Sequence, residues 1–116
     1  MPNHVSLRIA SLRDLIETGL YQANLDRIVA ECGELSQDSP YVLEFFVMKQ
    51  IFSEISASLD GEPVTAARHE DLVLGIAQTS IVLLDKMLNG EQVQFFELKE
   101  FVATHVRNVN LFRADR

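Results

Sequence analysis

The sequence is poor in residues that define several classes of protein. It has one cysteine, no tryptophan, five glycines and three prolines among 116 residues. A single cysteine, Cys32, cannot form an internal disulfide, which excludes a small cross-linked secreted scaffold. The glycines are dispersed, so neither a phosphate-binding loop nor a nucleophile elbow is present, because both need glycines at fixed short spacings.

Positive charge is also scarce. Lys and Arg number 10 against 17 Asp and Glu, for a formal net charge of −7. Nucleic-acid binding depends on clustered cations, so we expect no nucleic-acid partner. The acidic balance and the lack of a basic amphipathic face argue against membrane binding. The longest apolar-rich stretch, residues 72–84, is too short and too polar to span a bilayer. With no signal peptide visible, we expect a cytoplasmic protein.

Apolar residues recur at helical spacing along the whole chain. The pattern predicts an all-α fold, an up-and-down bundle of four main helices in one domain over residues 1–116. Gly33, Gly61 and Gly90 each follow a periodic segment, where the left-handed residue after a helix usually stands. After the first block, the expected helices cover residues 40–59, 66–88 and 92–112, with Ser39 as the N-cap of the first of these.

The first block carries two apolar stripes. One runs from Val5 to Leu20 and the other from Tyr21 to Leu35, rotated by well over a quarter turn from the first. One straight helix cannot point both at the same core. We favour a break or strong kink between Gly19 and Asn24, with Asn24 capping the second piece. The alternative is one long helix whose halves pack against different neighbours.

The expected helix over residues 66–88 is apolar over an unusually wide arc. The arc is roughly 200°, where a surface helix needs about 100°. Leu74, Ile81 and Leu88 form a row at spacing seven within it. We therefore expect a homodimer with this helix at the interface. In the competing interpretation, the helix lies at the centre of the monomer, covered by the two halves of the first block.

A smaller apolar patch is expected on the helix over residues 40–59. Val42 and Phe46 lie away from its core stripe, and Phe46 stands on an otherwise polar face. Exposed apolar side chains that gather in one place mark contact surfaces. We therefore add Val42 and Phe46 to the expected interface.

The last helix carries the most distinctive single residue, His105. It belongs to an apolar stripe whose members are Phe95, Leu98, Phe101, Val102, His105, Val106, Val109 and Phe112. In one interpretation His105 is a core or boundary histidine whose ring bonds to a backbone carbonyl or a polar side chain. In the other it is a ligand-binding, acid–base or pH-sensing group in a pocket lined by Phe101, His105 and Phe112.

No chemistry of a recognisable kind accompanies this histidine. Glu-x-x-His pairs, which a di-metal carboxylate bundle needs, are missing, so we expect no metal and no cofactor. Two glutamates flank Cys32, which disfavours a reactive thiolate, and no catalytic residue can be named. The first hypothesis is a non-enzymatic, dimerising protein with a regulatory, scaffolding or chaperone-like role and a possible protein partner. The second is a small-ligand binder or enzyme with a pocket near His105.

Overall fold

The computed structural model describes residues 2–20, 22–59 and 67–114, and the side chains within residues 4–20, 23–57 and 75–107. In this part of the chain it forms five helices, α1 (Pro2–Thr18), α2 (Gln22–Asp38), α3 (Val42–Leu59), α4 (Ala67–Leu88) and α5 (Phe95–Ala114). The all-α prediction is confirmed. The count of four main helices is off by one, because the first block forms two separate helices.

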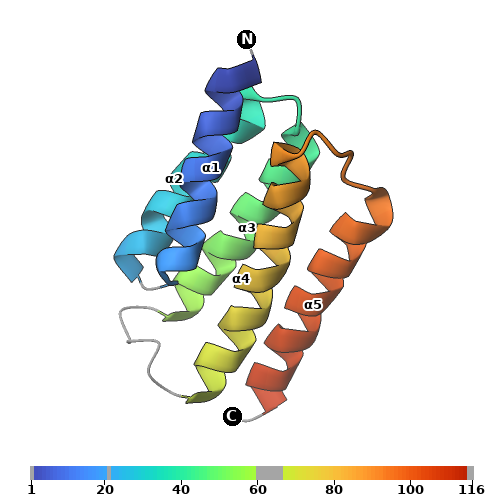
Figure 1. Cartoon of the computed structure of the whole chain (residues 1–116). Helices are drawn as coiled ribbons and strands as arrows, with labels where there is room; N and C mark the ends of the chain where they lie inside the picture. The colour runs from blue at the N-terminus through green and yellow to red at the C-terminus, as the bar shows by residue number, and fades with distance from the viewer. Residues whose placement is uncertain (1, 21, 60–66, 115–116) are drawn as a thin grey trace.

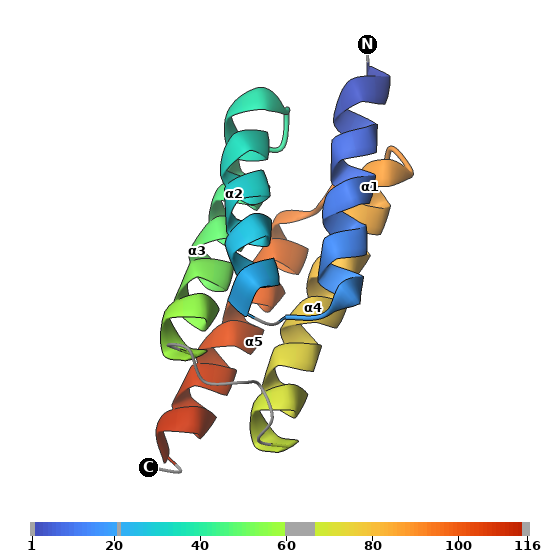
Figure 2. The same cartoon turned by 90° about the vertical axis from the view of Figure 1, so that its left-hand side faces the viewer.

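Successive helices run in opposite directions, which gives the bundle its up-and-down order (Figure 1). α1 packs against α2 and α4, α2 packs against α3, and α5 packs against α3 and α4. Figure 2 shows α2 beside α3 on one side of the bundle and α1 beside α4 on the other. Because their directions alternate, α3 and α5 run the same way (Figure 1).

The break between α1 and α2 falls where the two apolar stripes change direction. Gly19 follows α1 with φ +135°, a conformation that residues with a Cβ rarely adopt. Asn24 was expected to cap α2, and this is wrong, because α2 begins two residues earlier, at Gln22. Instead, the buried side-chain amide of Asn24 donates hydrogen bonds to the carbonyls of Leu15, at 2.6 Å, and Gly19, at 2.5 Å. Asn24 therefore caps the C-terminal end of α1.

The other helix ends agree with the sequence only in part. Gly90, with φ +74°, terminates α4 as expected, and the Glu91 amide donates to the Lys86 carbonyl at 2.8 Å, as in a Schellman motif. Gly33 does not end a helix, since α2 continues to Asp38. The buried residues on either side of it, Cys32 and Leu35, pack in the core, and this burial offsets the roughly 1 kcal/mol that an interior glycine costs. Gly61 lies outside the described residues.

The N-terminal boundaries of α3 and α5 also differ from expectation. α3 begins at Val42, so Ser39 is not its N-cap; the Ser39 hydroxyl accepts a hydrogen bond from the Tyr41 amide at 3.2 Å in the preceding turn. α5 begins at Phe95, three residues after the expected start. The first i→i+4 hydrogen bonds of α3 and α5 are accepted by the carbonyls of Tyr41 and Gln94, so these residues, and not earlier ones, occupy the N-cap positions.

Among the described side chains, α3 and α4 each contribute five buried apolar residues to the core, more than any other helix. Fully buried side chains come from all five helices, the largest being Phe45, Phe52 and Phe101. α4 contacts α1 and α5, so two helices of the same chain lie against it. Ile81 and Leu88 are partly buried and pack on this core, whereas Leu74 lies outside the described side chains. Much of the wide apolar arc of α4 is thus covered within one chain.

Candidate functional site

His105 lies on the inner side of α5, next to α3. Its Nε2 atom is 2.7 Å from Oε2 of Glu54, and the histidine side chain is 8% exposed while that of Glu54 is 65% exposed. The ring thus has the polar partner that the packing interpretation requires. Phe101, one turn before His105, is fully buried in the core, and Phe112 lies outside the described side chains.

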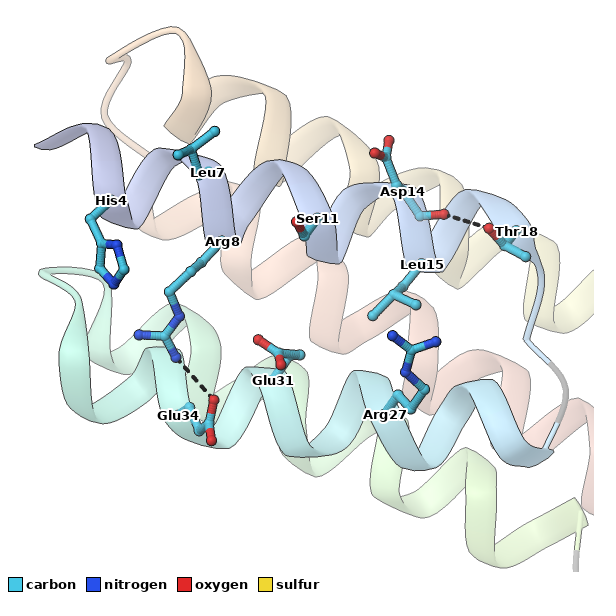
Figure 3. A pocket seen from close by; sticks show the side chains of 10 residues that line it. All are labelled: His4, Leu7, Arg8, Ser11, Asp14, Leu15, Thr18, Arg27, Glu31 and Glu34. Atoms are coloured by element: carbon cyan, nitrogen blue, oxygen red, sulfur yellow. Dashed lines mark hydrogen bonds and ion pairs between the residues drawn. The ribbon is translucent and has the colours of Figure 1, made fainter.

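The structure does show a groove, but it lies between α1 and α2, whereas His105 is on α5 (Figure 3). Its volume is about 620 Å³, and His105 is not among the residues that line it. Arg8 crosses the groove from α1 to Glu34, at 3.1 Å, and to Asp38, at 3.4 Å, on α2. Further along, Figure 3 shows Glu31 and Arg27 of α2 across from Ser11 and Leu15 of α1.

The groove has charges of both signs and no activated nucleophile. In the described structure, the Ser11 hydroxyl has no hydrogen bond to a histidine or a carboxylate that could serve as a general base. Arg27 and Glu31 are four residues apart on α2, yet they form no ion pair in the described structure. Such a surface can hold a small polar molecule that carries both charges, but it has no group arranged for covalent catalysis.

Other charged groups tie α4 to its neighbours. Arg13 of α1 bonds Asp85 of α4 at 2.5 Å, and this hydrogen bond raises the pKa of the arginine. Lys86 of α4 forms an ion pair with Glu97 of α5. The hydrogen bond from Lys86 is the main reason that the pKa of Glu97 lies below its ordinary value. These pairs are structural, because each carboxylate is already bound to a cation of the same chain.

Cys32 has no reactive character. It is fully buried in α2, and burial, with a smaller contribution from the charge of Glu31, raises the pKa of its thiol to about 12. The thiol is therefore protonated at neutral pH, and a thiol in that state is neither a nucleophile nor a metal ligand. Among the described side chains, no three His, Cys, Asp or Glu residues cluster closely enough to hold a metal ion.

The most prominent unexplained feature is a set of large apolar side chains left in solvent on α3 and α5. Val42 and Phe46, expected at an interface, are about half exposed, as is Leu43 beside them. On α5, Phe95, Val102 and Val106 are exposed although the sequence placed them in the core stripe. That placement is wrong because α5 packs at the edge of the bundle, and only the narrower strip with Leu98, Phe101 and His105 turns inward.

The exposed residues of α5 lie on the side that turns away from α4. Glu97 faces α4, because it pairs with Lys86, and His105 faces α3, because it bonds Glu54. At about 100° per residue, Val102 and Val106 are rotated from His105 by about 60° and 100°, in the direction away from Glu97. Phe95 follows the same row, rotated by about 80°.

Two of the exposed residues of α3 lie on the same side of the bundle. Ile51 of α3 faces the core and Glu54 faces α5. Leu43 and Phe46 are rotated from Glu54 by about 20° and 80°, away from Ile51, and therefore flank the outer side of the α3–α5 contact. Val42 is rotated by about 120° and lies toward α2, because it is within about 20° of Lys49, whose side chain lies beside Gly33 of α2. We call the surface formed by Leu43, Phe46, Phe95, Val102 and Val106 the α3–α5 face.

No protein-family model matches the chain, and neither a curated protein nor a solved structure matches it significantly. No helix in the described ranges is both long enough and apolar enough to cross a bilayer. Any functional conclusion therefore depends on the geometry of this chain alone.

Proposed function

We propose that the protein is a non-enzymatic, dimerising helical module that acts through protein–protein contact, in a regulatory, scaffolding or chaperone-like role. The observation that supports this proposal is the α3–α5 face. Five large exposed apolar side chains lie on it although the chain already has a buried core. Large apolar side chains that lie together on the surface of a folded chain are a feature of contact surfaces.

The groups that chemistry would need are committed to structure instead. The ring of His105 is bonded to Glu54, the thiol of Cys32 is buried and protonated, and Arg8 is paired with two carboxylates of α2. An enzyme needs at least one such group aimed at a cavity with an activating neighbour. This arrangement favours a function in protein–protein interaction over a function in catalysis.

The mass of the purified chain in solution tests the dimer. Light scattering and sedimentation equilibrium across the micromolar range should give twice the chain mass of 13.1 kDa, with dissociation on dilution. We expect no hydrolase or transferase activity from the same samples. A mass of one chain at every concentration would contradict the dimer, and with it the proposed mode of action.

A second candidate function, small-ligand binding, is favoured by the α1–α2 groove and not by the surroundings of His105. The groove volume of about 620 Å³ lies within the range of small-molecule sites. Arg27 and Glu31 offer opposite charges that a zwitterionic molecule could bridge. A screen of amino acids and short peptides by thermal shift tests this. Stabilisation that disappears in Arg27→Ala and in Glu31→Ala, and persists in the groove-remote Lys99→Ala, would favour the ligand-binding function.

A further inference from the structure

We infer that the occupant of the α3–α5 face is a second copy of this chain, so that the dimer forms through α3 and α5 and not through the apolar row of α4. This inference depends on the proposed function, and it adds the surface through which two copies meet. Three observations carry it: the area of the face, its charge, and the coverage of α4 within the monomer.

The area of the face matches what a stable dimer needs. Its five side chains are between about one third and three quarters exposed. A half-exposed Phe, Leu or Val leaves roughly 80–100 Å² in water, so together they leave about 450 Å² of apolar surface. A standard interface buries about 800 Å² on each partner, of which somewhat over half is apolar. The face therefore supplies the apolar share of one side of such an interface.

The charge of the face favours a copy of the same chain. Each chain carries a formal net charge of −7, so two copies repel each other over most of their surfaces. On the α3–α5 face, the negative charge of Glu54 is offset by the positive charge of Lys99, which stands on the exposed side of α5 between Phe95 and Val106. The face is thus close to neutral, and repulsion between two acidic copies is smallest there. A basic partner would instead be attracted to the acidic surfaces elsewhere on the chain.

The row of α4 cannot serve equally well. Ile81 and Leu88 already pack on the core of their own chain, and α1 and α5 both contact α4. Exposing them to a partner would require the loss of contacts that stabilise the monomer. The other large exposed side chains in the described structure are Leu7, Val42, Val82 and Phe96. Leu7 of α1 and Val82 of α4 belong to helices that do not form the α3–α5 face, so they make suitable controls.

The test compares charged substitutions on and off the face. Phe46→Glu combined with Val102→Glu should raise the dimer dissociation constant at least about 100-fold and give helical monomers. Leu7→Glu combined with Val82→Glu adds the same charge elsewhere and should leave the dimer intact. Circular dichroism and thermal unfolding show that each variant is folded. The milder pair Phe46→Gln and Val102→Thr provides the same comparison if the charged pair fails to fold, with a dissociation constant raised about tenfold.

Each outcome decides the inference. A dimeric unmodified chain, monomeric face variants and dimeric controls would support it. If the unmodified chain and the face variants dimerise equally, the surface is wrong while the proposed dimer stands. Dissociation in both pairs alike would also overturn the assignment, because added charge anywhere would then suffice. An unmodified chain that is monomeric up to about 100 µM would overturn both proposals and leave the face to a different protein.

Discussion

Replacing Asn24 by alanine tests the account of the break between α1 and α2. The Asn24 side chain is 2% exposed, and its amide nitrogen donates to two carbonyls at the end of α1. Alanine removes both donors and leaves the carbonyls of Leu15 and Gly19 without these partners. A net hydrogen bond is worth about 0.5–1.5 kcal/mol, and a buried acceptor left unsatisfied costs about 1–3 kcal/mol. We expect Asn24→Ala to lower the free energy of unfolding by about 2 kcal/mol.

A second substitution separates the hydrogen bonds from the loss of packing. Asn24→Asp keeps the shape of the side chain but replaces the donor with an oxygen that faces two carbonyl oxygens, so it should destabilise more than alanine does. Asn89→Ala, at the exposed end of α4, is the matched control and should cost less than about 0.5 kcal/mol. Urea unfolding followed by circular dichroism, at one protein concentration for all variants, measures these differences. The reasoning is refuted if Asn24→Ala matches the control, or if Asn24→Asp is more stable than Asn24→Ala.

Three further predictions follow from contacts inside the bundle. Cys32 should react slowly with iodoacetamide at pH 8 in the native protein and rapidly in denaturant, because burial raises the pKa of its thiol to about 12; equal rates would contradict this. Lys86→Met should lower stability at pH 7, and urea unfolding at several pH values should show the difference shrinking as the pH falls. This direction follows from the lowered pKa of Glu97, because the stability that its ionised carboxylate contributes is present above the ordinary glutamate pKa and is lost on acidification. A stability difference that does not depend on pH would contradict the prediction. His105→Leu should change the free energy of unfolding by less than about 1 kcal/mol, because water can replace the ring at the exposed Glu54; a loss above about 2 kcal/mol would indicate a buried network and favour the ligand-binding function.

The fold class was predictable because burial in a helix repeats with the helical period. The stripes from Ile9 to Leu20 and from Leu25 to Leu35 are buried as their spacing indicates, and their change of direction located the break near Gly19. The role of Asn24 was not predictable. Its carbonyl partners come from five and nine residues earlier, and they face its side chain only after α1 and α2 have folded against each other.

Helix ends that depend on tertiary contacts were harder to predict than those set by local chemistry. Gly90 has positive φ and closes α4 through hydrogen bonds within its own turn, so its local sequence is informative. Gly33 has the same local appearance but lies inside α2, where the packing of Cys32 and Leu35 prolongs the helix. A glycine alone cannot distinguish these cases, because the deciding energy comes from other helices.

The candidate surface was found only in part, for a related reason. Val42 and Phe46 stood out because they lie away from the core stripe of their helix, and both are exposed, although only Phe46 lies on the α3–α5 face. Phe95, Val102 and Val106 did not, because they share a broad apolar arc with the buried Leu98 and Phe101. A helical wheel gives the width of an apolar arc, whereas the neighbouring helices determine which part of the arc they cover.

The excess of apolar surface that first indicated a dimer is therefore still present, but on different helices. The arc of α4 exceeds what one neighbour can bury, and α5 meets this need by packing against it from the edge of the bundle. A helix at the edge has neighbours on one side only, so the remaining part of its own apolar arc stays in water beside α3. Covering α4 within the chain and exposing the α3–α5 face are thus two consequences of the same arrangement. If that face is where two copies meet, the dimer completes the burial that five helices begin.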